Sequence, residues 1–590
     1  MLQRWFTGKS ETGSAAVARV GRAGVIAAML VGWVGSTGFA QSPAAPAPAD
    51  DAGAPVQISV DLNSRIAPYR PIYRWFGYDE ANYTTTAGGQ ALLRELHALT
   101  PAPVFVRVHH LLTSGNGTPD LKWSSTGVYR EDAQGHAIYD WRILDGIFDG
   151  YKAAGVKPMV ELGFMPQDLA AGTPARPYHV AFPKGDVLSG ASNNMPKDYR
   201  KWEALTRAVT AHLVQRYGRD EVLGWHFEVW NEPDIEYWHG TAADYLKLYD
   251  YAVAGVRAAL PGASVGGPAT TGPRGERARA FLKTFLDHVA TGRSAADGGA
   301  VPLSFISFHA KGQPQVHGDD VTMGINKELD DVDRGFALIA TYPKLRKLPV
   351  ILSEADPEGC AACSSKMNPA NDYRNGTLYP AYTAAVYKRI FDLTAKYRID
   401  LIGMLSWSFE FEGRDYFEGF RSLSTHGIDK PELNFFRMAG LLAGEQVAAS
   451  SSAETPLTTM LSQGVRNGPD VAALATANAR SAAVLVWNYR DTERDAPARD
   501  VEVRIAGLPR DRSRVLLEHF RIDATHSNAY TVWKAMGSPQ HPSAQQTAEL
   551  QRAGQLQMLS SPQWIEVKDG VATLPLTMPG ESLSLLRLSW

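Results

Sequence analysis

Residues 224–234 read Gly-Trp-His-Phe-Glu-Val-Trp-Asn-Glu-Pro-Asp, an apolar run that ends in a polar turn containing a proline. The run from Gly224 to Trp230 has the length and the aromatic and β-branched content of a strand. Amphipathic stretches with helical spacing flank it, Tyr199 to Tyr217 before it and Tyr245 to Leu260 after it. A strand between two helices indicates a parallel sheet, because parallel strands need a crossover connection.

The same alternation continues on both sides of this stretch. Seven further apolar runs are separated by helical stretches: Phe76 to Tyr78, Val104 to Val108, Pro158 to Leu162, Ser264 to Pro268, Phe305 to Phe308, Pro349 to Leu352 and Leu401 to Trp407. Eight such units predict an α/β fold, a (β/α)₈ TIM barrel over residues 73–440. An open doubly wound sheet would usually carry a Gly-rich phosphate turn after its first strand, and the sequence has none there.

The pattern changes after about Gly440. Short strands with turn residues between them follow: Ser481 to Trp487, Val501 to Ile505, Val515 to Leu517, Gly570 to Leu574 and Ser582 to Leu588. This spacing predicts a C-terminal β-sandwich over residues 441–590. One more strand lies within residues 56–72, ahead of the barrel, and we expect it to join the sandwich.

Composition and charge exclude several classes of protein. The 590 residues include 59 Lys plus Arg and 62 Asp plus Glu, a formal net charge of −3, so there is no basic footprint for nucleic acid. Hydrophobic residues make up 44% and charged residues 21%, which is ordinary globular composition and argues against a disordered or fibrous chain. Two cysteines are too few for a scaffold built on disulfides.

Residues 1–40 have the features of an export signal. Basic residues precede an apolar run, Gly24 to Val34, and small residues follow it as far as Ala40. The run is about 11 residues long, short of the about 20 that span a bilayer. Residues 41–55 are rich in Ala and Pro and indicate a linker. We expect an exported protein, periplasmic or secreted, with no membrane segment in the mature form; an uncleaved anchor is the alternative.

Two acids stand at the ends of predicted strands. Glu232 follows the fourth strand and Glu354 follows the seventh. In a TIM barrel the reactive side chains lie at the C-terminal ends of the strands, so these carboxyl groups are expected to face each other across the barrel mouth. Glycoside hydrolysis uses such a pair, one as general acid and the other as nucleophile or base. A single acid at a strand end is usually solvated or paired, but the two together favour a glycosidase.

Four stretches resemble motifs of glycoside hydrolase family 39, the β-xylosidases and α-L-iduronidases of clan A: Val106 to Leu112, Phe227 to Asp234, Ile306 to Gly312 and Ser353 to Pro357. The resemblance implies that Glu232 is the acid/base and Glu354 the nucleophile. It implies retention of configuration through a glycosyl-enzyme, with the carboxyl groups about 5–5.5 Å apart. It also implies an oligosaccharide substrate, and neither a metal nor another cofactor.

The resemblance assigns substrate contacts as well. It implies that Asn231 binds the sugar 2-hydroxyl, and that His109 and His309 donate to sugar hydroxyls or to the nucleophile. Lys311 matches the position where iduronidases hold the substrate carboxylate. A surface lysine and a partner for Asp356 are the alternatives for that residue.

Strand alternation adds further expectations. His109 and His110 are adjacent and would face opposite sides of a strand, so only one of them is expected to point inward. Arg107 shares the face of His109, and we expect it in the barrel interior, paired with a carboxylate. Glu228 has the same parity as Glu232, and because a buried glutamate needs a partner we expect it to be structural.

The loops after the last two strands hold the remaining candidates. Trp407 ends the eighth strand, where an aromatic platform for a pyranose would stand, with core packing as the alternative. Glu412 and Arg414 are candidates for binding distal hydroxyls. In a cytosolic protein Cys360-Ala-Ala-Cys363 would suggest redox chemistry, whereas an exported chain favours a disulfide that stiffens the loop after the nucleophile. Two thiolates without a nearby histidine argue against zinc.

These observations favour an exported retaining exo-glycosidase. Within the family we expect a β-D-xylosidase acting on xylo-oligosaccharides, because an exported enzyme with a signal of bacterial appearance would meet plant xylan. Lys311 and the segment Glu354-Ala-Asp-Pro357 favour an iduronidase-like pocket instead, and an α-L-arabinosidase is a third alternative. A different class is a non-catalytic carbohydrate-binding protein on a hydrolase scaffold, because fold alone does not determine function.

Overall fold

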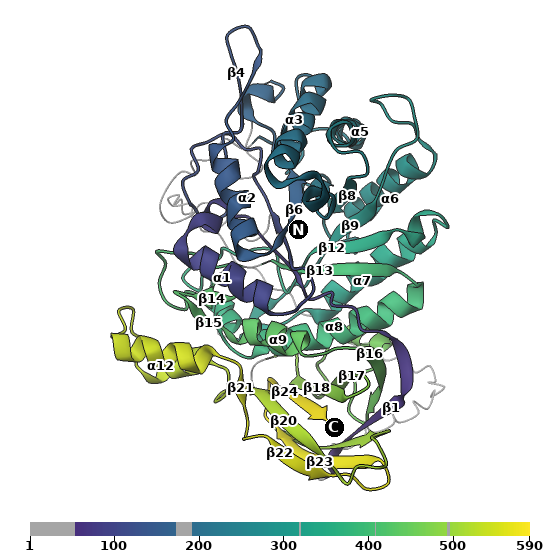
Figure 1. Ribbon diagram of the computed structural model, residues 1–590, viewed down its shortest axis with the longest axis vertical. Coiled ribbons are helices and arrows are strands. Elements are labelled where there is room, and N and C mark those ends of the chain that lie inside the picture. Colours follow the sequence, from purple (N-terminus) through teal and green to yellow (C-terminus); the bar gives the residue numbers. More distant parts are fainter. Residues whose placement is uncertain (1–53, 173–191, 318–319, 408, 493–495) are drawn as a thin grey trace, which may run out of the picture. The chain divides into compact units, whose positions relative to one another are not determined.

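The computed structural model describes residues 54–172, 192–317, 320–407, 409–492 and 496–590 (Figure 1). The predicted export signal, residues 1–40, lies outside the described residues, as does all but the last two residues of the predicted linker. Within the described part of the chain, no helix has both the length and the apolar character that a membrane span requires.

Eight strands of the described chain close into a parallel barrel, which confirms the predicted fold class. In chain order they are β2 (Trp75–Tyr78), β3 (Phe105–Val108), β6 (Lys157–Leu162), β7 (His226–Val229), β8 (Ser264–Thr270), β9 (Phe305–Lys311), β12 (Pro349–Asp356) and β13 (Asp400–Trp407). The last strand pairs with the first, Leu405 opposite Trp75, so the sheet has no open edge.

Helices surround this barrel (Figure 1). They are α1 (Ala87–Ala98), α2 (Arg142–Ala154), α3 (Tyr199–Tyr217), α4 (Arg219–Leu223), α5 (Ala242–Ala259), α6 (Glu276–Thr291), α7 (Ile325–Ala340), α8 (Leu378–Tyr397) and α9 (Pro431–Gly440). Local sequence explains several of their ends. Helix α5 begins at a capping box of Thr241 and Asp244, and α2 ends at Gly155, which takes the left-handed φ of 80° that suits glycine.

Two barrel strands run three or more residues further than the sequence pattern indicates. Predicted to end at Phe308 and Leu352, β9 and β12 continue to Lys311 and Asp356. The reason is that the polar residues after each apolar run still pair, with Asp356 opposite Lys311 in the parallel ladder. Side chains expected in loops are therefore held by the rigid sheet.

The C-terminal strands form a second sheet of ten strands within the described residues, folded around an apolar core of its own. Its members are β1 (Val56–Pro68), β16 (Glu445–Ser451), β17 (Asp470–Ala477), β18 (Ser481–Tyr489), β19 (Arg499–Ala506), β20 (Arg514–Ile522), β21 (Gln557–Met558), β22 (Gln563–Glu566), β23 (Val571–Met578) and β24 (Ser582–Ser589). The strand ahead of the barrel, β1, pairs antiparallel with β16 and parallel with β19.

Strands β17, β18 and β24 are buried on both faces. One face, which includes Val484 and Val486, lines the sandwich core, and the other, which includes Leu485 and Trp487, packs in the core of the barrel unit. Figure 1 shows α8 and α9 between the barrel strands and this sheet. A buried ion pair of 2.8 Å, from Arg389 on α8 to Asp470 on β17, also links the two parts. The two-sided burial explains why these strands read as continuous apolar runs.

Two helices between β20 and β21 were not predicted from the sequence, α11 (Ala529–Ala535) and α12 (Ala544–Gly554). Their local signals are a cap at Asn528 and a capping box of Ser543 and Gln546. The described chain also contains the short helix α10 (Leu457–Gln463) and three two-stranded sheets: β4 (Tyr129–Glu131) with β5 (Ala137–Tyr139), β10 (Gln315–His317) with β11 (Asp320–Thr322), and β14 (Ser424–Thr425) with β15 (Ile428–Asp429).

Candidate active site

The interior of the barrel is layered. An apolar plug consists of Trp75, Phe105, Met159, Phe305, Ile351 and Leu405, and the partly buried Ile402 packs against it. Further along β3, β6 and β7, the next inward positions hold Arg107, Glu161 and Glu228, all with no exposed surface. Alternate residues of a strand share a face, so these charged side chains form a layer above the plug, toward the C-terminal ends of the strands.

Arg107 is the centre of the charged layer. Its guanidinium lies 2.5 Å from Glu228, 3.0 Å from Glu161 and 3.1 Å from Glu354. It also donates from Nη2 to Oδ1 of Asn231 at 3.0 Å. The structure thus places Arg107 in the barrel interior beside carboxylates and places Glu228 in a structural pair. One cation faces three carboxylates where water does not reach.

Glu354 is turned toward this layer by an irregularity in β12. Leu352 pairs with Phe308, but the next pair is Glu354 with His309, so Ser353 is an extra residue on its strand. An inserted residue reverses which side chains face inward beyond it. The bulge therefore gives Glu354 the inward orientation that uninterrupted alternation would have given Ser353.

Positive groups crowd the Glu354 carboxylate. Lys311 Nζ lies 2.9 Å from Oε2, and Arg107 Nη1 lies 3.1 Å from Oε1. His109 and His309 lie 3.4 and 3.7 Å from the same carboxylate. Burial alone raises the pKa of Glu354, but His309, Lys311, His109 and Arg107 outweigh burial and hold the pKa well below its usual range. The group is therefore ionised at neutral pH.

Glu232 follows β7 in a strained turn. Trp230 and Glu232 both have a positive φ, 73° and 46°, and the N–H of Glu232 donates to the carbonyl of Ala269 at 2.9 Å. Left-handed backbone at residues other than glycine costs free energy and is concentrated at functional sites. The turn brings Glu232 Oε1 to 2.9 Å from His309 Nδ1, and a carboxylate oxygen of Glu232 lies within 4.8 Å of one of Glu354.

Lys311 joins two carboxylates on β12. Its ammonium lies 2.9 Å from Glu354 and 2.6 Å from Asp356. Burial lowers the pKa of Lys311, but these two carboxylates outweigh burial and raise it. Of the roles considered for this residue, the structure shows the pairing with Asp356 directly. It also shows that two carboxylates already balance the charge of this ammonium group.

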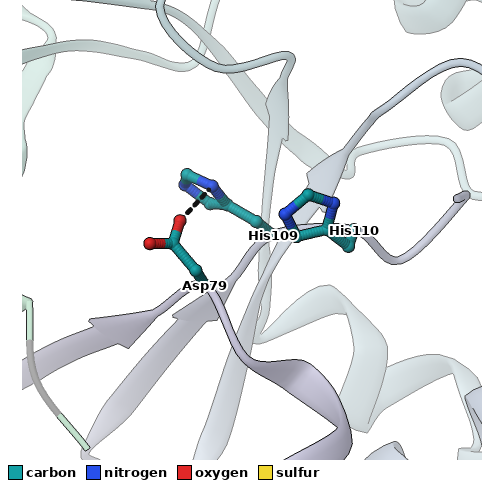
Figure 2. A group of neighbouring side chains, drawn as sticks. All are labelled: Asp79, His109 and His110. Atoms are coloured by element: carbon teal, nitrogen blue, oxygen red, sulfur yellow. Dashed lines mark ion pairs between the residues drawn. The ribbon is translucent and has the colours of Figure 1, made fainter. Parts of the chain in front are cut away.

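His109 stands between the first strand and the nucleophile. Figure 2 shows its ring beside the carboxylate of Asp79, which follows β2; the distance from His109 Nδ1 to Asp79 Oδ1 is 2.8 Å. Its Nε2 lies 3.1 Å from Glu161 and 3.4 Å from Glu354. Burial lowers the pKa of His109, but Glu161 and Asp79 outweigh burial and raise it to about 9.

The alternation expected for His109 and His110 does not hold. Strand β3 ends at Val108, and His110 takes a left-handed φ of 66°, so the pair is not extended. Both rings are buried, and both bring a nitrogen within 4.8 Å of the Asp79 carboxylate. Burial and the neighbouring His109 lower the pKa of His110 to about 3, so this ring is neutral at working pH.

Trp407 lies under the charged groups and does not stand open beside them. It is only 2% exposed, its ring is 4.5 Å from the ring of His109, and the guanidinium of Arg107 lies 5.0 Å from its centroid. The expected open platform is therefore absent in this structure, and the packing alternative describes Trp407. Glu412 is exposed and accepts the N–H of Gly88 in the first turn of α1. This contact caps the N-terminus of α1, and substrate binding by Glu412 stays a prediction.

Three residues near the catalytic candidates escaped the sequence analysis: Asp79, Glu161 and Lys122. Asp79 had the same signal as Glu232, an acid directly after a barrel strand. Glu161 stands inside the otherwise apolar run from Pro158 to Leu162, and a buried carboxylate requires a partner. Lys122 carried no local signal, because it lies in the loop after β3 and meets Asp79, at 2.8 Å, only in the folded chain.

Cys360 and Cys363 form a disulfide in the loop that follows β12, with their Cα atoms 5.5 Å apart. Arg374 donates to the carbonyl of Cys363 at 2.8 Å and to that of Cys360 at 2.9 Å. The loop after Glu354 is thus held both by the covalent bond and by a buried guanidinium.

Two clusters bring together side chains of the types that bind metals: Asp79, His109 and His110, and Glu232, His309 and Glu354. Each already has a resident cation. Lys122 lies 2.8 Å from Asp79, and Lys311 lies 2.9 Å from Glu354. These ammonium groups would repel a further cation, so the donor sets fit internal ion pairing better than metal binding.

Known proteins match this chain along most of its length. The model of "Glycosyl hydrolases family 39" matches residues 106–564. The β-xylosidase of Geobacillus stearothermophilus is 28% identical over 502 residues, which cover 82% of this chain and 86% of that protein. The α-L-iduronidase of Mus musculus is 28% identical over 371 residues, covering 59% of this chain and 55% of that protein.

A solved structure described as the bacterial orthologue of human α-L-iduronidase has a TM-score of 0.71 at 21% identity, and the match covers 90% of this chain and 84% of that one. That likeness shows the shared fold. The family match spans well over half of the chain and includes both segments that carry Glu232 and Glu354. The chain therefore belongs to glycosyl hydrolases family 39, and the protein is a glycoside hydrolase.

Proposed function

We propose that this glycoside hydrolase is a retaining exo-glycosidase in which Glu354 is the nucleophile and Glu232 the acid/base. The observation that carries the proposal is that a carboxylate oxygen of Glu232, after β7, lies within 4.8 Å of one of Glu354, on β12, across the barrel mouth. Inverting enzymes leave about 6.5–9.5 Å between their carboxyl groups for a water molecule, whereas retaining enzymes have about 5–5.5 Å. The short separation supports direct attack by Glu354.

In the first half of the proposed reaction, an oxygen of Glu354 attacks the anomeric carbon. The glycosidic C–O bond breaks, and the leaving oxygen takes the proton of Glu232. The surroundings suit this division of roles. Arg107 and Lys311 keep Glu354 ionised, while within the described part of the chain the ion-pair partner of Glu232 is His309. Asn231, whose Oδ1 accepts from Arg107, is proposed to meet the sugar 2-hydroxyl.

In the second half, Glu232 takes a proton from water, and the water oxygen attacks the anomeric carbon. The ester bond to Glu354 breaks, and its electron pair returns to the carboxylate. The same cations that keep Glu354 ionised stabilise this returning charge. His309 lies 2.9 Å from Glu232 and 3.7 Å from Glu354, so it is close to both the acid/base and the nucleophile in this step.

We propose a β-D-xylosidase acting on xylo-oligosaccharides. Relatives named β-xylosidase, from Geobacillus stearothermophilus and Caldicellulosiruptor saccharolyticus, are 28% and 29% identical over 82% and 70% of this chain. Ion pairing at Lys311 supports a neutral sugar, because its ammonium already has Glu354 and Asp356 within 2.9 Å. The carboxylate of an iduronide would have to compete with both Glu354 and Asp356 for the ammonium group of Lys311. Iduronidase-like and α-L-arabinosidase activities are the other outcomes of the test.

The test is hydrolysis of four aryl glycosides: β-D-xyloside, α-L-arabinopyranoside, α-L-arabinofuranoside and α-L-iduronide. We expect the β-D-xyloside to be the fastest, with β-xylose as the first product by NMR. A dominant iduronide rate would overturn the substrate, and α-xylose as the first product would overturn retention. A 2-fluoro-xyloside should add one sugar mass to the peptide that contains Glu354.

Replacing the nucleophile separates an enzyme from a sugar-binding protein. Glu354→Ala should abolish turnover and leave binding of xylo-oligosaccharides measurable by calorimetry. Unchanged hydrolysis in this variant would contradict the assignment of Glu354. Asp250→Asn, which breaks a buried pair with His288 on the outer helices α5 and α6, is the control for nonspecific loss of stability.

We also propose that the protein is exported. The signal pattern of residues 1–40 supports this, and so does the disulfide between Cys360 and Cys363, since disulfides persist in oxidising compartments. Edman sequencing of the protein from the culture medium or periplasm should begin close to residue 41. Recovery only from the cytoplasm, with both thiols reduced, would contradict export.

A further inference from the structure

A short chain of charges leads from the loop after β3 to the proposed nucleophile. Lys122 Nζ lies 2.8 Å from Oδ2 of Asp79, and Asp79 Oδ1 lies 2.8 Å from Nδ1 of His109 (Figure 2 shows the second pair). On the other side of the imidazole, Nε2 lies 3.4 Å from Oε1 of Glu354. The side chains of Asp79 and His109 are only 3% and 2% exposed, so these interactions are shielded from water.

Carboxylates predominate among the groups that face the His109 ring. The groups come from five elements: Asp79 after β2, Arg107 on β3, Glu161 on β6, Glu354 on β12 and Trp407 on β13. Three are carboxylates, and the one cation among them is Arg107, whose Nη1 lies 2.9 Å from Nε2. The adjacent His110 is neutral at working pH, as its lowered pKa shows. This balance favours an imidazolium, in agreement with the raised pKa of His109.

Lys122 is held in place at a conformational cost. It is the only residue of this charge chain with a positive φ in the described structure, at 69°. Its N–H donates to Oε1 of Glu80 at 2.8 Å, and Glu80 directly follows Asp79. A bulky residue in the left-handed region persists only where its surroundings stabilise it. The two contacts fix the loop after β3 to the end of β2.

We infer that Asp79, itself anchored by Lys122, is a positioning residue that holds the His109 ring as a positively charged donor against Glu354. The inference rests on the proposed function, since it assigns a purpose to the charge beside the nucleophile. It adds a specific consequence for the second half of the reaction. When the ester to the sugar breaks, the carboxylate of Glu354 regains its charge, and the imidazolium stabilises that leaving group.

Asp79→Asn removes the anion and keeps the shape. The pKa of His109 should fall by about one unit or more, a tenfold change in its proton affinity. Breakdown of the glycosyl-enzyme should slow more than its formation. We therefore expect kcat and KM on aryl β-xylosides to fall together, by about tenfold, while kcat/KM changes less. Intact-mass analysis during turnover should show the glycosyl-enzyme accumulating.

Lys122→Met provides a second measurement if Asp79→Asn does not fold. Removing the competing cation leaves Asp79 to act on His109 alone, so the pKa of His109 should rise rather than fall. NMR titration of ¹⁵N-histidine-labelled protein, with His109 assigned through His109→Gln, reads both shifts. Opposite shifts in the two variants would not arise from a merely structural role.

Asp250→Asn is the matched control, because it also breaks a buried aspartate–histidine pair. Asp250 and His288 are 3.0 Å apart, and they lie on the outer helices rather than at the barrel mouth. The substitution should lower stability and keep the wild-type values of both kcat and KM. An unchanged pKa of His109 in both test variants, or a loss confined to kcat/KM, would overturn the inference. If the wild type hydrolyses no glycoside, the proposed function fails, and the two NMR shifts still decide whether Asp79 and Lys122 control His109.

Discussion

Replacing Arg107 by methionine is the sharpest test of how the barrel interior is stabilised. The side chain has no exposed surface, and its guanidinium lies within 3.1 Å of Glu161, Glu228 and Glu354. Methionine fills a similar volume and makes none of these contacts. The variant thus leaves three buried carboxylates that have lost their shared cation.

The expected loss follows from the cost of unpaired buried charge. Removing one partner of a buried ion pair typically costs about 3–5 kcal/mol. The loss is not three times larger, because His109 still faces Glu161 and Lys311 still faces Glu354. The entropy of unfolding, ~2.1 cal/mol/K per residue over 590 residues, is about 1.2 kcal/mol/K, so Tm should fall by about 2–4 °C.

The loss should grow with pH. Burial raises the pKa of Glu161 to about 7, against 4.5 for an ordinary glutamate, although His109 and Arg107 oppose the rise. A group with a raised folded pKa contributes stability below its unfolded pKa and loses that contribution as the pH rises through the folded value. Without Arg107 the pKa of Glu161 rises further. The variant therefore loses about 1.4 kcal/mol more for each pH unit between about 7 and the new pKa.

Circular dichroism melts at about pH 6 and about pH 8.5, at one fixed scan rate, measure both effects. Arg142→Met is the control, because Arg142 is 87% exposed and its pair with Asp140 lies at the surface. Its Tm should change by less than about 1 °C. A drop of that small size for Arg107→Met, or an equal drop at both pH values, would refute the reasoning.

Three further predictions concern the surroundings of the site. Gly77→Ala would place a methyl group 2.3 Å from the ring of Trp407, so about 1–3 kcal/mol of stability and part of kcat should be lost; a normal melt would contradict the close packing. Reduction of the disulfide between Cys360 and Cys363, which closes a four-residue loop, should cost roughly 2 kcal/mol, and melts that are identical with and without reductant would oppose it. Burial raises the pKa of Glu328 to about 8, so its stabilising contribution is complete below about pH 4.5 and lost by about pH 8. Glu328→Gln should flatten the decline of Tm across that range, and an unchanged slope would argue against the raised pKa.

The barrel could be predicted from the sequence because each of its units is a local pattern. An apolar run such as Gly224 to Trp230 and the amphipathic stretches beside it are visible within about 60 residues of sequence. The same locality placed Glu232 and Glu354 at strand ends. Elements with weaker local patterns were missed, as α11 and α12 were, because their helical spacing is short and stands among strands.

The charged interior could not be predicted as a whole. Arg107 and Glu228 were expected in the barrel interior, but that Glu161 shares the guanidinium depends on the register of three parallel strands. The bulge at Ser353 arises from the way β12 pairs with β9, which the local sequence does not show. This bulge turns the side chain of Glu354 inward. Trp407 illustrates the same limit, since its position at a strand end allowed either an open platform or a buried floor.

What the sequence by itself determined is the order of strands and helices, the barrel they form and the two acids at its strand ends, because hydrophobic periodicity acts between near neighbours. Only the tertiary structure decided how those acids are charged. The pKa of Glu354 depends on Arg107, His109, His309 and Lys311, which lie on or directly after two other strands, β3 and β9, and up to 247 residues away along the chain. Electrostatic interactions follow distance in space, and that distance exists only once the barrel has closed.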